Sequence, residues 1–199
     1  MGAGAALGPF PAGADQPVTE LFTWVFATLF VLVIIAWYLS YTAARLDRLH
    51  VRLGGTLAAL DARLVRRAEA AVELANSGLL DGATALLLAT AAGESLESPS
   101  EHGEARERAE SDLTEALELA LTPSVVEALS ATAHGQDLVD KVASACTRVQ
   151  LARRFHNDAV TDVRRVRHKW TIRIFHLAGH TPLPGTVEFD DAMPSPLAT

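Results

Sequence analysis

The chain has 199 residues, which is enough for one domain of ordinary size with smaller segments attached to it. Its net charge is −7, but acidic side chains concentrate in residues 94–118 and basic side chains in residues 148–173. The acidic part would repel phosphate, so the composition disfavours nucleic-acid binding. The single cysteine, Cys146, excludes an intramolecular disulfide and a multi-cysteine zinc site. Because it lies on the apolar face of a predicted helix, we expect its side chain to be buried.

An apolar run near the beginning of the chain predicts a membrane-spanning helix. Residues 21–41 contain no charged residue, proline or glycine, and about 20 apolar residues suffice to cross the ~30 Å hydrocarbon core. Trp24 stands near the start of the run and Trp37, Tyr38 and Tyr41 near its far end, as aromatic residues do at membrane interfaces. A buried core helix is the alternative, but such a helix is seldom apolar on every face. A cleaved signal peptide is disfavoured because residues 1–20 contain no lysine or arginine.

The charges that flank this run predict its orientation. Only Asp15 and Glu20 precede it, whereas several arginines follow it, beginning with Arg45 and Arg48. The positive-inside rule then places the C-terminal part of the chain in the cytoplasm. Residues 18–41 are predicted to be the transmembrane helix, and residues 1–17, rich in glycine, alanine and proline, a flexible tail on the outer side.

The rest of the chain has the periodicity of helices. Leucine and other apolar residues recur at spacings of three and four, and the predicted helices are 42–75, 82–92, 104–121, 123–134 and 136–178. Gly93 is expected to end the second of these helices, and Gly179 the last. The proline-containing residues 180–199 are expected to be extended or disordered. No useful stretch alternates with a period of two, so we predict an all-α protein: a transmembrane helix followed by an antiparallel cytoplasmic bundle, residues 42–179, with two long helices.

Three segments of the chain have the order and composition of known motifs. Residues 60–67 read LDARLVRR, residues 148–160 read RVQLARRFHNDAV, and residues 180–189 read HTPLPGTVEF. They resemble, in this order, the basic motif, the Asn-Asp-Ala-Val signature and the C-terminal ending of the LemA family. The chain departs from the family pattern at His156, where a tyrosine is usual, so it resembles a divergent member. The resemblance implies a protein of the bacterial inner membrane with an antiparallel helical bundle and no known enzymatic activity.

A basic cluster near the end of the last predicted helix is a candidate membrane-surface contact. Anionic lipid attracts basic side chains by about 1 kcal/mol each, and an antiparallel bundle returns this helix end toward the membrane. A solvated helix face is the alternative. The residues concerned are Arg164, Arg165, Arg167, Lys169, Trp170 and Arg173.

Polar residues on the two motif helices form a second candidate, an interaction or register patch. They are Arg63, Arg67, Arg153, Asn157 and Asp158. One hypothesis is a polar site for an anionic ligand or the end of a peptide. The other, which we favour, is a set of salt bridges between helices that fix their register.

The sequence contains no motif of a common catalytic class. G-x-S-x-G, the P-loop, G-x-G-x-x-G and H-E-x-x-H are absent, so we expect no catalytic, cofactor or metal site. The pattern favours a membrane-anchored interaction or scaffold module of the bacterial cell envelope. Its expected partners are anionic lipid and an unidentified protein or a second copy of the chain. A lipid-contacting homo-oligomeric structural protein is the alternative, and an enzyme with an unrecognised site is a third.

Overall fold

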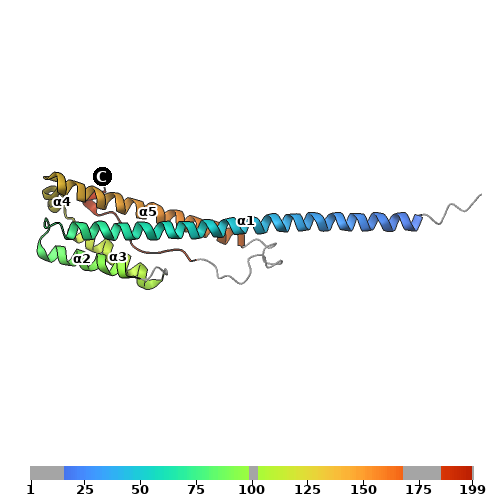
Figure 1. Cartoon of the computed structure of the whole chain (residues 1–199), viewed down its shortest axis with the longest axis horizontal. Coiled ribbons are helices and arrows are strands. Elements are labelled where there is room, and N and C mark those ends of the chain that lie inside the picture. Colours follow the sequence, from blue (N-terminus) through green and yellow to red (C-terminus); the bar gives the residue numbers. More distant parts are fainter. Residues whose placement is uncertain (1–15, 99–102, 168–184, 199) are drawn as a thin grey trace, which may run out of the picture. The chain divides into compact units, whose positions relative to one another are not determined.

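The computed structural model describes residues 16–98, 103–167 and 185–198 (Figure 1). The described residues form five α-helices and a short 3-10 helix, with no strand among them, which confirms the all-α prediction. The helices are α1 (Gln16–Ala75), α2 (Gly82–Glu97), α3 (Glu104–Ala120), α4 (Pro123–Ser130) and α5 (Ala133–Arg167), followed by η1 (Ser195–Leu197). The chain divides into two compact units, Met1–Arg45 and Leu46–Thr199.

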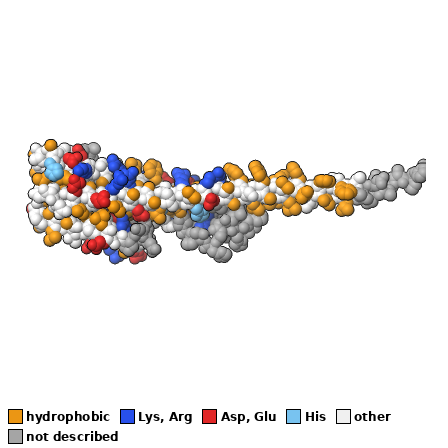
Figure 2. Space-filling view, in the orientation of Figure 1, with side chains coloured by type: hydrophobic (Ala, Val, Ile, Leu, Met, Phe, Trp, Pro, Cys, Tyr) orange, Lys and Arg blue, Asp and Glu red, His pale blue; other side chains and the backbone are white. Residues whose placement is uncertain are grey.

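The part of α1 in the first unit is long and apolar enough to span a membrane, as the sequence predicted. Its most apolar stretch has a mean hydropathy of 2.2 and no buried residue. Figure 2 shows uncovered hydrophobic side chains along the visible face of this helix, whereas the core helix of a soluble protein would be covered. The hydroxyls of Thr23 and Thr28 donate to the carbonyl oxygens of Thr19 and Trp24, each at 2.8 Å. These polar groups are therefore satisfied within the helix, as an apolar surrounding requires.

In the second unit, the turn between α1 and α2 is fixed by local hydrogen bonds. Gly78 has a φ of +74°, a left-handed conformation that costs glycine little. Asp81 then caps α2, because its Oδ1 accepts from the backbone N–H groups of Ala83 and Thr84, both at 3.1 Å. The predicted stop after Ala75 is therefore confirmed.

Two predicted helix boundaries are wrong. Helix α2 continues past Gly93 to Glu97, because Gly93 keeps a helical backbone and nothing there forces a turn. Helix α4 ends at Ser130 and α5 begins at Ala133, before the predicted boundary at 134–135. The hydroxyl of Thr132 accepts the Gly135 N–H at 3.0 Å and caps α5. Of the predicted helix 136–178, the part after Arg167 lies outside the described residues.

The second unit is an antiparallel bundle. Lys141 of α5 pairs with Glu73 of α1 at 2.8 Å, and further along the two helices Thr56 lies 3.3 Å from His156. From the first contact to the second, the residue number falls in α1 and rises in α5, so the two helices run in opposite directions. In Figure 1 this part of α1 lies between α5 and the hairpin of α2 and α3.

The five helices share one main apolar core. Its fully buried side chains include Leu74 of α1, Leu88 of α2 and Leu113 of α3. Cys146 belongs to the same cluster with an exposed fraction of 2%, so the prediction of a buried thiol is confirmed. Burial raises the pKa of this thiol above its ordinary value and keeps it neutral.

Two glycines provide a matched test of the helix packing. A Cβ at Gly135 would lie 2.8 Å from the carbonyl carbon of Leu129 and 2.9 Å from the Thr132 hydroxyl, whereas a Cβ at Gly93 would meet nothing within 4 Å. We expect Gly135→Ala to destabilise the full-length protein by about 1–3 kcal/mol through overpacking. Gly93→Ala should stabilise it by roughly 0.5–1 kcal/mol by reducing the entropy of the unfolded chain. Denaturant unfolding in non-ionic detergent, followed by circular dichroism, measures both, and shifts of the same sign would contradict this packing.

Candidate functional site

Helix α3 carries a carboxylate into the protein interior. Glu110 has an exposed fraction of 0%, and its Oε2 accepts a hydrogen bond from Arg67 of α1 at 2.7 Å. Its Oε1 lies 3.0 Å from Nε of Arg106, one helical turn earlier, and accepts from the Ser95 hydroxyl of α2 at 2.9 Å. This cluster, Glu110 with Arg67, Arg106 and Ser95, joins three helices.

The charges of the cluster are stabilised by several further groups. Taking an ion out of water costs several kcal/mol unless partners replace the water. Arg106 also donates to the carbonyl oxygens of Ser95 and Ser98 at the C-terminal end of α2, where a helix favours a positive charge. Arg67 donates to Thr114 at 3.0 Å, and its guanidinium carbon lies 5.8 Å from the centre of the Phe189 ring.

Phe189 belongs to a segment, residues 185–198, that packs against the bundle. The segment begins without helix or strand, and its side chains Val187 and Phe189 are 3% and 9% exposed. They form a second apolar cluster with Leu60, Leu64 and Val149. The expected extended or disordered tail therefore includes a part that contributes to the domain core.

Side chains of the bundle bind the backbone of this segment as a neighbouring β-strand would. The Asn157 amide accepts from the Val187 N–H at 3.0 Å and donates to the Val187 carbonyl at 3.1 Å. The Thr114 hydroxyl donates to the Asp190 carbonyl at 2.6 Å, and Gln150 to the Asp191 carbonyl at 2.7 Å. An amide that pairs with both backbone groups of one residue replaces the two bonds that a residue on an antiparallel strand would supply, so these contacts favour an extended backbone at Val187.

An ion pair also holds the side chain of one residue of the segment, Asp191. Nε and Nη2 of Arg153 donate to the two carboxylate oxygens of Asp191, at 2.7 and 2.9 Å. Through these bonds Asp191 raises the pKa of the Arg153 guanidinium above its ordinary value. Further along, the hydroxyl and N–H of Ser195 both donate to Glu118 and lower the pKa of that carboxyl.

Side chains of α1, α3 and α5 thus form a groove that contacts alternate residues of this segment. Val187, Phe189 and Asp191 contact the bundle, whereas Glu188 and Asp190 are exposed. A period of two is the spacing that a peptide in β-conformation presents to one surface. Main-chain hydrogen bonds supply affinity in such an arrangement, and pockets for alternate side chains supply specificity.

The structure divides the predicted polar patch into three parts. Arg153 and Asn157 bind the segment, and Arg67 touches it through the Phe189 ring. Arg63 is half-buried in a separate cleft between α1 and α5, and Asp158 is exposed. Sequence reasoning missed Glu110, although its place among the inward positions of α3 was a signal.

The predicted basic cluster is described only in part. Arg164, Arg165 and Arg167 lie in the last turn of α5, and Arg165 is 3.5 Å from Asp162. Lys169, Trp170 and Arg173 lie outside the described residues.

No protein-family model, curated protein or solved structure matches this chain. Within the described ranges, no three histidine, cysteine, aspartate or glutamate side chains are grouped so that they could hold a metal ion. What the residues of the groove can do chemically is to bind an extended, partly acidic peptide through hydrogen bonds, an ion pair and apolar contacts.

The buried cluster predicts a large effect of removing its carboxylate. Glu110→Gln removes the negative charge that pairs with the buried Arg67 and Arg106. It should therefore destabilise the full-length protein by about 3–5 kcal/mol. Glu115→Gln on the exposed side of the same helix is the control, expected within about 0.5 kcal/mol of the unchanged protein. Denaturant unfolding measures both. Equal stability of the two variants would contradict a structural role for the cluster.

Substitution of the adjacent residues Asn157 and Asp158 tests how the segment is held on the bundle. Asn157→Ala removes both hydrogen bonds to Val187, so amide hydrogen exchange in residues 185–191 should accelerate by about tenfold or more. Asp158→Ala changes an exposed neighbour and should leave the exchange of this peptide unchanged. Mass spectrometry of peptic fragments reports both, and unchanged protection in Asn157→Ala would mean that the amide does not hold the segment.

Proposed function

We propose that this chain is a membrane-anchored interaction module whose helical bundle binds extended acidic peptide segments. The observation that carries the proposal is the groove occupied by residues 185–198. Within it, Asn157 pairs with both backbone groups of Val187, and Arg153 pairs with Asp191. The bound pattern is two apolar residues and an aspartate at alternate positions, which a partner protein or a second copy of the chain can also present.

The chain's own segment acts as a tethered occupant of the site. A segment of the same chain has a high effective concentration at the site, roughly in the millimolar range, so a free segment must compete with it. This competition makes the groove selective. An incoming peptide displaces the segment only if its apolar contacts and its ion pair with Arg153 are more favourable than those of residues 187–191.

The membrane anchor is the apolar part of α1. Its flanking arginines support a single-pass arrangement with the N-terminus outside and the bundle in the cytoplasm. The resemblance to the LemA family supports a bacterial inner membrane and a role in the cell envelope. The recognised segment then belongs to a cytoplasmic protein or to the cytoplasmic part of a membrane protein.

The proposal is tested with a labelled peptide that contains residues 185–198. The full-length chain carrying Phe189→Ala, held in non-ionic detergent, has a weakened internal occupant, because Phe189 is a buried anchor. It should bind the peptide about tenfold more tightly than the unchanged chain in fluorescence anisotropy. Adding Asn157→Ala should remove this gain, whereas adding Asp158→Ala should preserve it. Absence of saturable binding to the Phe189→Ala chain, or binding that is insensitive to Asn157→Ala, would reject the proposal.

A further inference from the structure

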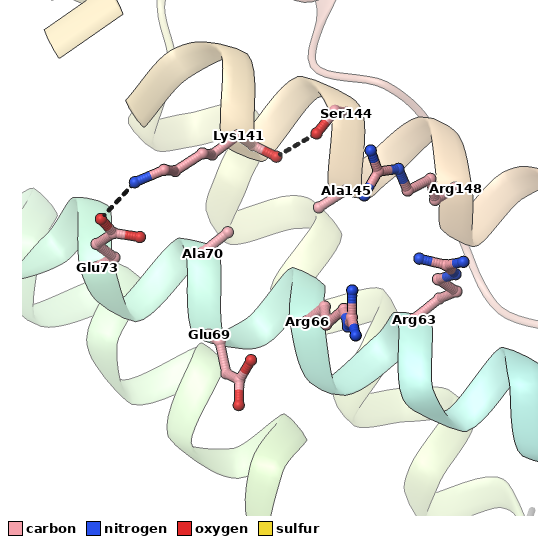
Figure 3. Close-up of a pocket in the computed structure, with 9 residues that line it drawn as sticks. All are labelled: Arg63, Arg66, Glu69, Ala70, Glu73, Lys141, Ser144, Ala145 and Arg148. Carbon is pink, nitrogen blue, oxygen red and sulfur yellow. Dashed lines mark hydrogen bonds and ion pairs between the residues drawn. The ribbon is translucent and has the colours of Figure 1, made fainter. Parts of the chain in front are cut away.

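A separate cleft opens between α1 and α5. It has a volume of about 430 Å³ and is lined from α1 by Arg63, Arg66 and Glu69 among others, and from α5 by Lys141 and Arg148. This volume lies within the range of small-molecule sites, roughly 300–1,000 Å³. In Figure 3, Arg63 and Arg148 lie on the sides of α1 and α5 that face each other, with Arg66 beside Arg63, while Glu69 points away from α5.

The three arginines of this cleft differ from the other basic groups around them. Lys141, at the opposite end of the cleft, is held by Glu73 at 2.8 Å and by Asp137 at 3.0 Å. In contrast, Arg63, Arg66 and Arg148 form no ion pair within residues 16–98, 103–167 and 185–198. Three like charges in one cleft repel one another, although the chain has an excess of acidic residues that could have neutralised them.

The cleft continues into a neighbouring hollow. Arg63 and Arg148 also line this second space of about 380 Å³, together with Arg52, Thr56 and Phe155. The Phe155 ring is 61% exposed. The basic groups thus stand next to an uncovered aromatic side chain, an arrangement that suits a ligand with an anionic head and a less polar remainder.

We propose that Arg63, Arg66 and Arg148 form a binding site for the phosphate group of such a ligand, whether a free phosphate ester or a lipid headgroup. The planar guanidinium presents parallel N–H donors that match phosphate oxygens in pairs. A phosphate monoester carries up to two negative charges near neutral pH. It therefore neutralises the three cations of the cleft more completely than a single carboxylate does. The site is independent of the peptide groove, and neither proposal requires the other.

The first test measures binding of pyrophosphate to the full-length chain in non-ionic detergent by isothermal titration calorimetry. The cleft variant combines Arg66→Gln and Arg148→Gln, two exposed positions. Its matched control combines Arg108→Gln and Arg154→Gln, also exposed, and has the same net charge. Circular dichroism verifies that all three proteins are folded. We expect the cleft variant to lose about tenfold or more in affinity and the control to stay within about twofold of the unchanged chain.

A second test distinguishes the two sources of phosphate. The full-length chain in nanodiscs of phosphatidylcholine is mixed with vesicles of phosphatidylcholine, with and without phosphatidic acid, whose headgroup is a phosphate monoester, and flotation measures association. Pyrophosphate binding that depends on the cleft, without association with phosphatidic acid vesicles, supports a free phosphate ester. Association that requires phosphatidic acid and is lost only in the cleft variant supports a lipid headgroup. Equal losses in cleft and control variants, or no saturable binding of either probe, would overturn the site.

Discussion

The rest of the helical domain depends on the ion pairs of the buried Glu110 carboxylate. Without a charged partner it could not leave water, and it has two, Arg67 and Arg106, which come from different helices. The requirement to pair this one carboxylate fixes α1 against α3, and the Ser95 hydroxyl brings the end of α2 to the same point. The guanidinium of Arg67 then offers its face to Phe189, so the position of the C-terminal segment follows from the same cluster.

The domain uses its arginines in two distinct ways. Arg67, Arg106 and Arg153 are buried or half-buried, and each has a carboxylate within 3.0 Å. Breaking such a pair costs much more than an exposed pair contributes, because one charge is left behind without water. Of the arginines that line the cleft between α1 and α5, Arg66 and Arg148 are exposed and Arg63 is half-buried, and none of the three forms an ion pair among the described residues. This contrast separates the charges that hold the bundle together from those available to a ligand.

The helices could be predicted from the sequence because their signal is local. Leu60 and Leu64, one turn apart, already mark the buried face of α1. Glycine was less informative: Gly78 ends a helix with a positive φ, whereas Gly93 remains inside one, and the residue type alone does not distinguish the two. The polarity of Arg153 and Asn157 was visible, but their partners lie 38 and 30 positions away. Pairing over such distances along the chain is set by tertiary packing. The alternation of Val187 and Phe189 with polar residues is too short to be recognised in the sequence alone.

The position of residues 185–198 in the chain has a consequence for biosynthesis. Domains fold from the N-terminus as the chain is made, at about 5–20 residues per second, and every helix that forms the groove precedes the segment that fills it. Contacts such as Asn157 with Val187 therefore form after the local helices and the α2–α3 hairpin. Each newly synthesised copy passes through a stage in which the helices of the bundle exist while the apolar wall of Leu60, Leu64 and Val149 is still uncovered. At that stage the nascent domain is open to chaperones and to neighbouring chains, and docking of residues 185–198 ends that exposure.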